Sequence, residues 1–397
     1  MADGKLRVAI FSDSALPILN GVSVSIDTLV QALRRAGHSV HVYTAGAPLY
    51  RDPDPNTFRF WAVETPWSKG YPLALPPFYR MLYEFRKHTY DVIHTHTPFT
   101  IGFVGLRWAE SHGIPIVSTY HTLYDRYAHY VPYFPRRYVR FKIAKHTHFY
   151  YSSVSEVIVP SDAARRWLQR HAVKTPVTVI PTGTPERRIL DRAEVRMQLG
   201  LEPGERMMLY VGRIAREKNL GPLFEMAAKV MAARPETRLW LVGDGPFRSE
   251  AMAMVRALRI GDKVRFVGAL PRHEVDLYYC AADVFVFSSL TETQGLVLQE
   301  AMTYGLPAVA YVGGGASETI QDGINGFGVR NDVSEFADRV LQVLGDDALH
   351  ARLSRGAMES VRNRGASEMA RSVVEVYRRA IGKHIPEEVG GARLSWF

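Results

Sequence analysis

Alternating strand and helix signals run along this sequence from end to end, and this order constrains the fold more than any other feature. Short apolar runs have the character of buried strands, and amphipathic stretches with helical spacing lie between many of them. The strand-like runs of the first half are 8–11, 40–44, 91–94 and 116–119. Those of the second half are 207–211, 238–242, 264–267, 284–287 and 308–311. The alternation predicts an α/β fold with parallel sheets covered by helices on both faces.

The length of the chain favours two domains. At 397 residues it is long for a single hydrophobic core, and each half repeats the alternating pattern. We therefore predict a Rossmann-like domain at 1–185, a second one at 186–385 and a loosely held tail at 386–397. Because ligands bind at the carboxyl ends of parallel strands, the predicted binding site lies in the cleft between the two domains.

Composition narrows the class of protein. Hydrophobic residues make up 47% of the chain and charged residues 22%, as in a globular protein. Cys280 is the only cysteine, which excludes an internal disulfide and a cysteine-based zinc cage. The N-terminal sequence leads directly into the first strand-like run, and no apolar stretch reaches about 18 residues. We expect a cytoplasmic protein with neither a signal peptide nor a membrane span.

Two glutamates flank the predicted join between a strand-ending loop and a helix. Glu292 lies in the loop, and Glu300 lies about two turns into the helix. The start of a helix carries free backbone N–H groups and a partial positive charge, which suit a phosphate. Here these amides belong to Gln294, Gly295, Leu296 and Val297. The two carboxylates then suit sugar and ribose hydroxyls. The alternative is that Glu292 caps the helix and Glu300 is solvated.

Two cations follow the strand-like run 207–211. Arg213 lies at the end of that strand and Lys218 just before the next predicted helix. An Arg and a Lys in one turn can bind a diphosphate and stabilise the charge that it gains as it leaves. The alternative is that Arg213 pairs with a structural acid. Glycine turns at Gly243 and at 313–315 are predicted to face the same cleft.

The first half offers weaker candidates. Gly21 and Val22 precede an amphipathic helix, and the glycine can let a phosphate approach the backbone amides. His121 follows a strand-like run at the edge of the predicted cleft. For His121 the alternative is a buried histidine whose hydrogen bonds are satisfied within the protein.

The net charge of +9 is unevenly placed. Residues 1–180 contain 21 Lys and Arg against 12 Asp and Glu, whereas the rest of the chain is balanced. The segment 126–155 contains no acid, and many tyrosines and phenylalanines lie between its cations. These cations are Arg126, Arg136, Arg137, Arg140, Lys142 and Lys145. Such a segment suits an anionic lipid surface or RNA. An ordinary amphipathic helix with a basic solvated face is the alternative.

A possible metal motif occurs at Asp52 and Asp54. The Asp-Pro-Asp sequence is similar to the Asp-x-Asp motif of other nucleotide-sugar enzymes, yet it lies in a proline-rich turn region. We interpret it as a turn and predict no metal.

These residues together resemble the retaining GT-B glycosyltransferases, a family that includes phosphatidylinositol mannosyltransferases and sucrose synthases. The resemblance spans nearly the whole chain. It implies two Rossmann-like domains, with a nucleotide-sugar donor held mainly by the second and an acceptor by the first. The Glu-x7-Glu motif of the family falls on Glu292 and Glu300, at the donor sugar and the ribose. Its diphosphate-binding pair falls on Arg213 and Lys218, its glycine loop on Gly21, and its sugar-facing histidine on His121.

A narrower resemblance rests on the sequences 119–130, 94–97 and 291–295. These are similar to the 1,2-diacylglycerol 3-glucosyltransferases, which work at membrane surfaces, use UDP-glucose and form an α-glycosidic glycolipid. The resemblance implies a lipid acceptor, peripheral association with the inner face of the cell membrane and no nucleic acid partner. It agrees with the position of the basic, aromatic segment 126–155.

The hypothesis that follows is metal-independent transfer of a hexose with retention of configuration and no cofactor besides the donor. The acceptor hydroxyl would attack on the face that the diphosphate leaves, while Arg213, Lys218 and the amides near Gly295 stabilise the departing charge. The sequence offers no convincing covalent nucleophile. Two alternatives remain open: an α-mannosyltransferase that uses GDP-mannose, and a non-catalytic GT-B-like binding protein.

Overall fold

The computed structural model describes residues 4–18, 20–47, 50, 52–63, 72–75, 78–123, 134–184, 188 and 190–384. The chain divides into two compact units. The first unit contains the chain up to Pro160, Ala164–Gly183 and the segment from Ala366 onward. The second unit contains Ser161–Ala163 and Thr184–Gly365.

Within the described residues, the first unit is built on a seven-stranded sheet in the order β3-β2-β1-β6-β7-β8-β9. All of its paired strands are parallel. The strands are β1 (Arg7–Ser12), β2 (Ser39–Ala45), β3 (Thr57–Phe60), β6 (Val92–Thr95), β7 (Ile116–Thr119), β8 (Glu156–Val159) and β9 (Val177–Val179). The short strands β4 (Ala62–Val63) and β5 (Leu73–Ala74) form a separate antiparallel pair.

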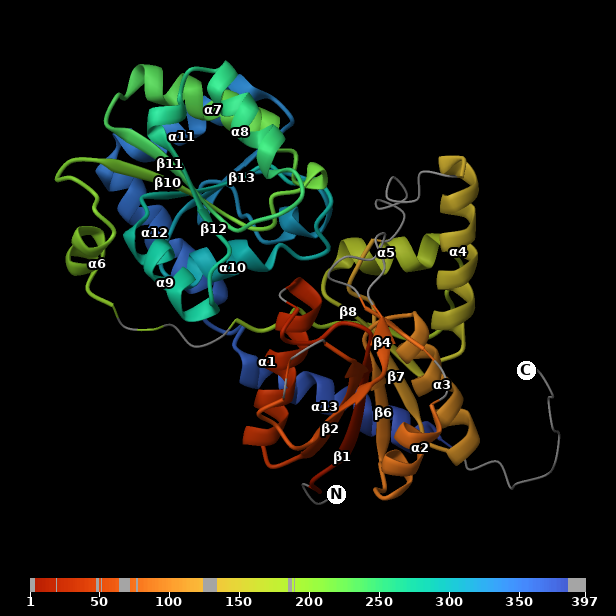
Figure 1. The fold of residues 1–397 in the computed structure, drawn as a ribbon. Coiled ribbons are helices and arrows are strands. Elements are labelled where there is room, and N and C mark those ends of the chain that lie inside the picture. Colours follow the sequence, from red (N-terminus) through yellow and green to blue (C-terminus); the bar gives the residue numbers. More distant parts are fainter. Residues whose placement is uncertain are drawn as a thin grey trace. The chain divides into compact units, whose positions relative to one another are not determined.

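Helices cover both faces of this sheet, because successive residues of each strand point to opposite sides. In β1, Val8 and Ile10 join the core that includes α1 and α13, whereas Phe11 joins the core that includes α3. Figure 1 shows α1 and α13 on one side of the sheet and α3 on the other. The helices are α1 (Gly21–Arg35), α2 (Tyr79–Arg86), α3 (Thr100–His112), α4 (Arg136–Ser152), α5 (Asp162–Arg170) and α13 (Ala366–Lys383).

The second unit holds a six-stranded parallel sheet in the order β12-β11-β10-β13-β14-β15. Its strands are β10 (Arg206–Val211), β11 (Thr237–Val242), β12 (Val264–Gly268), β13 (Val284–Phe287), β14 (Ala308–Tyr311) and β15 (Gly326–Val329). Its α-helices are α6 (Arg192–Gln198), α7 (Leu220–Ala233), α8 (Arg248–Ala257), α9 (Arg272–Ala281), α10 (Leu296–Thr303), α11 (Val333–Gly345) and α12 (Asp347–Val361). Its short 3-10 helices are η2 (Arg216–Lys218), η3 (Gly261–Lys263) and η4 (Gly314–Glu318).

Both strand orders are those of doubly wound Rossmann-like sheets, so the predicted α/β class with two such domains is confirmed. In each sheet the order reverses between two central strands, β1 and β6 in the first unit and β10 and β13 in the second. Ligands of such folds bind at the carboxyl ends of the strands at this switch point. The loops after these four strands are therefore where a site is expected.

The C-terminal helix departs from the predicted domain division. The prediction assigned 186–385 to one domain, and the division after Gly183 lies next to its boundary at 185. Helix α13, however, packs on the first sheet, where Met369, Val373 and Tyr377 join the core. Their spacing along the helix indicates an apolar face but does not indicate which of two similar sheets that face covers.

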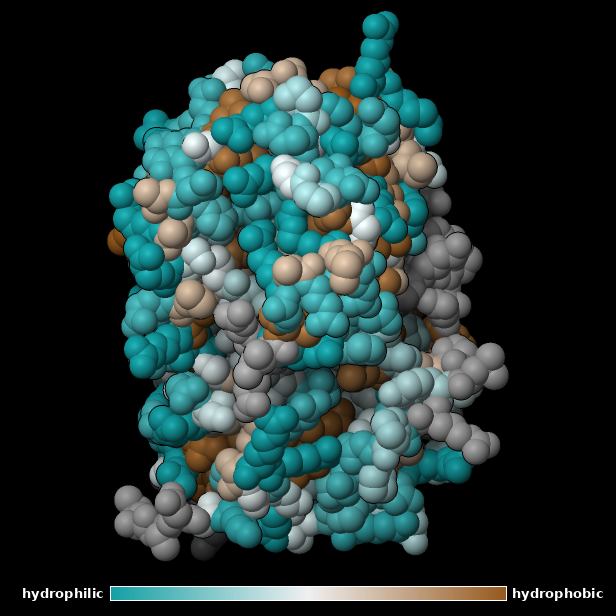
Figure 2. Space-filling model, turned by 90° about the vertical axis from the view of Figure 1, so that its left-hand side faces the viewer, coloured by the Kyte–Doolittle hydropathy of each residue, from teal (hydrophilic) through white to brown (hydrophobic). Residues whose placement is uncertain are grey.

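No helix in the described part of the chain is long and apolar enough to cross a membrane. Figure 2 shows one face of the molecule, on which hydrophilic residues predominate and apolar residues form small scattered groups.

Candidate active site

The loops that follow β10 and β13 meet at the switch point of the second unit. The Lys218 ammonium lies 2.5 Å from Glu292 Oε1, and the Ser289 hydroxyl donates to the same oxygen at 2.7 Å. The side chains of Lys218 and Glu292 are 17% and 18% exposed. The structure thus brings together two residues that the sequence predicted as parts of one site, 74 positions apart.

Further hydrogen bonds join these two loops. The Ser288 hydroxyl donates to the Lys218 carbonyl at 3.0 Å, and the Asn219 side-chain amide donates to the Ser288 carbonyl at 3.3 Å. The Thr291 hydroxyl donates to the Glu217 carbonyl at 3.4 Å. The ion pair therefore lies between two loops that are joined by hydrogen bonds, and these bonds fix its geometry.

Burial opposes charge on both partners of this pair, but their mutual attraction prevails. Burial raises the pKa of Glu292, whereas Lys218 and Ser289 lower it, and the net pKa lies below the usual value. Burial lowers the pKa of Lys218, whereas Glu292 and Tyr210 raise it, and the net pKa lies above the usual value. Both groups are therefore charged at neutral pH.

Helix α10 begins after Gly295, whose φ of +76° lies in the left-handed region that favours glycine. In the part of the chain that the structure describes, no side chain caps this N-terminus. The alternative role of Glu292 as its cap is therefore wrong. The first amides of the helix, at Leu296 and Val297, and the helix dipole suit an anion. The buried Gln294 side chain donates instead to Gln299 Oε1 at 3.0 Å.

Glu300 is held by two side chains from helix α9. Arg272 Nη1 donates to Glu300 Oε1 at 2.6 Å, and the Tyr279 hydroxyl donates to Oε2 at 2.9 Å. The Glu300 side chain is only 11% exposed, so the alternative of a solvated glutamate is wrong. Sequence reasoning missed Arg272 and Tyr279, because neither belongs to a motif and both lie more than 20 positions away.

Arg213 follows β10 and is exposed. Among the described residues no carboxylate pairs with its guanidinium, which differs from the alternative of a structural ion pair. Its backbone carbonyl accepts a hydrogen bond from the Tyr210 hydroxyl at 3.2 Å. The loop after β10 thus carries a half-buried, paired cation at Lys218 and an exposed cation at Arg213.

The glycine turns of this unit have packing roles. A Cβ atom at Gly243 would lie 2.0 Å from the Gly212 carbonyl oxygen, so this glycine lets the loop after β11 contact the loop that carries Arg213. This close contact explains why a glycine occupies position 243, without any bound ligand.

The turn after β14 supports the Glu292 loop. Cβ atoms at Gly314 and Gly315 would lie 2.3 Å from the Glu292 carbonyl oxygen and 1.7 Å from that of Thr293. The Gly315 amide donates to the Glu292 carbonyl at 2.7 Å. Larger residues in this turn would displace the loop that holds the carboxylate.

In the first unit, His121 lies just after β7 and is 9% exposed. Its Nε2 lies 2.9 Å from Nδ1 of His96, which follows β6. Burial lowers the pKa of His121 to about 4, so its imidazole is neutral at pH 7. His121 is thus both hydrogen-bonded within the protein, as the alternative interpretation expected, and placed at the carboxyl end of a central strand.

The predicted glycine loop of the first unit is largely engaged within the protein. Gly21 opens α1, and the Asn20 side chain accepts from the amides of Val22 at 3.0 Å and Ser23 at 2.9 Å. The Ser23 hydroxyl accepts in return from the Asn20 amide at 3.0 Å. This capping box uses the Val22 amide that the sequence analysis assigned to a phosphate.

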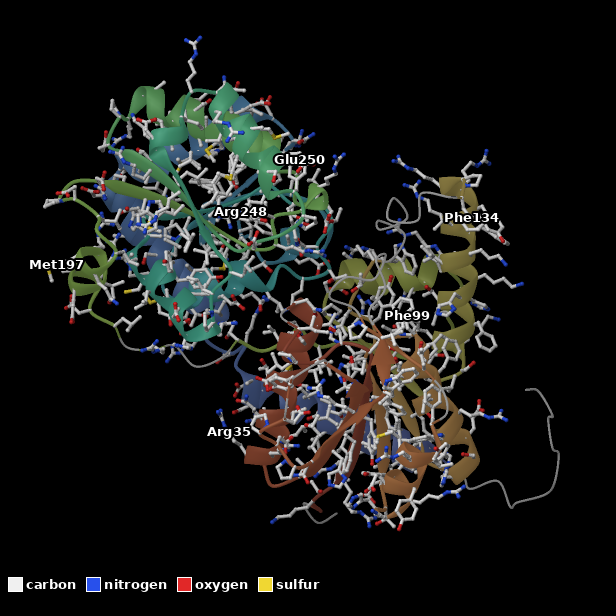
Figure 3. All side chains as sticks on the ribbon, in the orientation of Figure 1. Arg35, Phe99, Phe134, Met197, Arg248 and Glu250 are labelled. Carbon is white, nitrogen blue, oxygen red and sulfur yellow. The ribbon has the colours of Figure 1, made fainter. Side chains whose placement is uncertain are left out.

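Within the described residues, the part of the basic segment at 136–152 forms helix α4. Arg136, Arg137, Arg140, Lys142 and Lys145 are all exposed, and Arg126 lies outside the described residues. Large aromatic side chains on the same helix are exposed too, with 48% for Tyr138, 63% for Phe141 and 59% for Phe149. Figure 3 shows Phe134 at the start of α4 and side chains along this helix that project away from the sheet.

These residues share one face of α4. Tyr138, Phe141, Lys142, Lys145 and Phe149 recur at intervals of three or four, and at about 100° per residue they form one stripe. The opposite face is buried in the core through Val139, Thr147, Tyr150 and Tyr151. The exposed face thus combines cations and aromatic rings.

The Asp-Pro-Asp sequence is engaged by arginines. Arg59 Nε donates to Asp52 at 2.6 Å, and Arg34 lies 2.8 Å from Asp54. The Asp54 carboxylate also accepts from the Asn56 amide at 3.0 Å, as in a turn. Within the described residues no group of three or more His, Cys, Asp or Glu side chains has the geometry of a metal site.

Two family models match this chain. The model described as glycosyl transferases group 1 matches residues 191–360, and that described as Glycosyltransferase Family 4 matches residues 19–188. Among solved structures, sucrose-phosphate synthase from Thermosynechococcus elongatus superposes with a TM-score of 0.78 at 26% identity, covering 95% of this chain and all of that one.

Curated relatives span most of the chain. The alpha-monoglucosyldiacylglycerol synthase of Streptococcus pneumoniae is 32% identical over 320 residues, or 77% of this chain and 71% of the relative. The synthase of the same name from Acholeplasma laidlawii is 30% identical over 393 residues, or 96% and 98%. A GDP-mannose-dependent alpha-mannosyltransferase of Mycobacterium tuberculosis is 31% identical over 325 residues, or 79% and 81%.

Proposed function

We propose that this chain, which belongs to the GT-B glycosyltransferase family that contains the alpha-monoglucosyldiacylglycerol synthases, transfers glucose from UDP-glucose to a membrane lipid such as 1,2-diacylglycerol. The observation that carries this proposal is the charged Lys218 and Glu292 pair beside the uncapped start of α10. The chain is a glycosyltransferase by family. The donor, the acceptor and the course of the reaction are the proposal.

The donor site is proposed in the second unit. Lys218 has three N–H donors, and one of them is bound to Glu292, so two can meet a diphosphate. Arg213 adds an exposed guanidinium from the same loop, and the amides of Leu296 and Val297 add partial positive charge. Glu292 then accepts from sugar hydroxyls and Glu300 from the ribose.

The proposed reaction is metal-independent and retains the configuration at the sugar. As the bond to the sugar breaks, negative charge grows on the departing diphosphate, and Arg213, Lys218 and the start of α10 stabilise it. The acceptor hydroxyl attacks on the same face, and its proton passes to the departing diphosphate oxygen. A neutral His121 contributes a hydrogen bond to the transferred sugar rather than a charge.

The lipid acceptor is supported by the exposed face of α4. Each cation near an anionic membrane surface contributes about 1 kcal/mol to binding, and aromatic rings settle at the depth of the headgroups. Lys142 and Lys145 beside Tyr138, Phe141 and Phe149 match both requirements. Peripheral association with the inner face of the cell membrane follows from this proposal.

A second candidate is transfer of mannose from GDP-mannose, favoured by the mycobacterial relative. Transfer should be measured from a panel of UDP- and GDP-sugars, with and without vesicles that contain diacylglycerol and anionic phospholipid. The proposal predicts a lipid-extractable α-glucoside from UDP-glucose, at a rate that EDTA leaves unchanged. Transfer from GDP-mannose alone, or equal transfer without lipid, would select the second candidate or a soluble acceptor.

A further inference from the structure

Three histidines gather at the carboxyl ends of β6 and β7 in the first unit. His94 and His96 are 0% and 1% exposed, and His121 is 9% exposed. The ring centroids of His94 and His96 are 4.0 Å apart, and those of His96 and His121 are 5.2 Å apart. Neither family resemblance nor sequence motif assigned a role to His96.

The hydrogen-bond partners of these rings differ. His94 is satisfied at both nitrogens, with the Tyr377 hydroxyl 2.7 Å from Nδ1 and the Thr119 hydroxyl 2.7 Å from Nε2. Among the described residues His96 has one hydrogen-bond partner, since its Nδ1 lies 2.9 Å from His121 Nε2. His96 Nε2 is buried, and no described residue bonds to it.

Burial lowers the pKa of all three histidines, so each ring is neutral at pH 7. A neutral imidazole has one N–H donor and one acceptor nitrogen. The bond between His96 and His121 therefore holds one proton, carried by His96 Nδ1 or by His121 Nε2. In the second case His96 would carry its own proton on Nε2, as a buried N–H group without an acceptor. Orphaned buried N–H groups are rarer than orphaned acceptors, which favours the first case.

We propose that His96 is a positioning residue that donates from Nδ1 to His121 Nε2 and thereby holds His121 as its Nδ1–H tautomer. His121 then presents an N–H group at Nδ1, and its Nε2, which is occupied by His96, cannot act as a general base. This inference rests on the proposed function, which places a sugar at His121. It adds a residue and a direction of hydrogen bonding to that site.

The direct test is the tautomer of His121, read from the nitrogen chemical shifts of 15N-labelled full-length protein, with the His121→Gln spectrum for assignment. The proposal predicts a proton on Nδ1 of His121 in the unaltered protein. A proton on Nε2 would overturn it. The tautomer measurement does not depend on enzymatic activity, so its outcome is independent of whether the proposed transfer reaction occurs.

Two substitutions of His96 separate positioning from packing. His96→Asn keeps a side-chain N–H close to the place of Nδ1, and His96→Leu removes it. We expect His96→Leu to lose the single Nδ1–H tautomer of His121 and to lower kcat by about tenfold or more, with KM for the donor within about twofold. His96→Asn should restore both. Equal losses in the two variants would overturn the proposal.

Tyr377→Phe is the matched control. It removes a hydrogen bond from the neighbouring buried His94 without touching His96 or His121. It should lower the thermal stability of the first unit and leave the His121 signals and kcat unchanged. A loss of the His121 tautomer in this variant would mean that packing of the cluster, and not the His96 bond, sets it.

Discussion

Lys218 and Arg213 share a loop but differ in what surrounds them. The Lys218 ammonium neutralises a Glu292 carboxylate that is 18% exposed, and among the described residues the exposed Arg213 guanidinium has no carboxylate partner. Loss of Lys218 leaves a shielded charge unpaired, whereas loss of Arg213 leaves no such charge. The two cations are therefore expected to differ in stability effects even where they serve the same diphosphate.

Arg213→Ala is predicted to lower kcat by about 100-fold and to change the unfolding free energy by less than about 0.5 kcal/mol, because only charge at the leaving group is lost. Lys218→Ala should lower kcat similarly and also destabilise the second unit by about 3 kcal/mol. Steady-state kinetics and urea unfolding measure the two effects. Exposed Arg256→Ala and Lys229→Ala are the matched controls. Turnover within about threefold of the unaltered protein in both site variants would contradict the proposed mechanism.

The sequence indicated the elements that carry the residues of the candidate site, but it did not indicate the residues that hold them. Arg213, Lys218 and Glu292 lie in the loops after β10 and β13, and Glu300 lies within α10, so periodicity and turn chemistry indicate their places. Arg272 reaches Glu300 only through the packing of α9 against α10, which no local pattern encodes. His96 was missed for the same reason, because its hydrogen-bond partner His121 is 25 positions away.

At the scale of elements, helix α13 belongs to the unit that begins the chain. It buries Met369, Val373, Val374 and Tyr377 against the first sheet. Near its end, Lys383 lies 2.8 Å from the carboxylate of Glu156, which is 1% exposed in β8. Each large apolar side chain contributes about 1.5–3 kcal/mol when buried. The burial free energy of this one helix is therefore comparable to the total unfolding free energy of a domain.

Truncation before Ala366 is therefore predicted to unfold the first unit and leave the second folded. Hydrogen exchange of the full chain and the truncated chain measures both units at once, with the second unit as internal control. Protection that persists in β1 and β6 of the truncated chain would show that α13 is dispensable.

The exposed face of α4 is predicted to bind anionic membranes. Lys142→Gln with Lys145→Gln should weaken binding to anionic vesicles by about 30-fold, from about 1 kcal/mol for each cation. Salt should weaken the binding of the unaltered protein in the same direction. Sedimentation with vesicles measures the partition. Arg352→Gln with Arg355→Gln, an equal change of charge on exposed positions of α12, is the control. Equal losses in the two double variants would mean that net charge, and not this face, binds the membrane.

Apolar runs predicted nine of the described strands but not β3, β4, β5, β8, β9 or β15. The physical reason is plain for two of these six. Strand β8 begins with the buried Glu156, which breaks the apolar signal, and its charge is met by α13 from the far end of the chain. Strand β15 contains two glycines, which are rare in strands. Tertiary pairing outweighs local preference in both.

For the whole molecule, acid is predicted to destabilise the first unit. Burial lowers the pKa of His94 to about 3 and that of His121 to about 4, and it lowers that of His96 as well. The histidines of the unfolded chain take up protons near pH 6.5, and those of the folded chain do not. The stability that comes from burying these neutral histidines is therefore fully present above pH 6.5 and is lost as the pH falls. Each histidine contributes a slope of about 1.4 kcal/mol per pH unit. Burial raises the pKa of Asp13, so on acidification the folded chain takes up a proton there before the unfolded chain does. This uptake offsets part of the loss of stability.

Urea unfolding at pH 7, 6 and 5, followed by hydrogen exchange of peptides from β6 and β7, measures this slope. His94→Asn should reduce the slope, and the exposed His148→Asn should leave it unchanged. Equal stability of the first unit at pH 7 and pH 5 would contradict the prediction.

The proposed transfer of glucose to a lipid at a membrane surface can be measured as the initial rate of transfer from UDP-glucose into diacylglycerol vesicles, while the fraction of anionic phospholipid rises. We expect a lipid-extractable α-glucoside whose rate of formation rises with anionic lipid and is abolished by Glu292→Gln. No transfer into lipid at any anionic fraction, with turnover of UDP-glucose on a water-soluble acceptor, would contradict it.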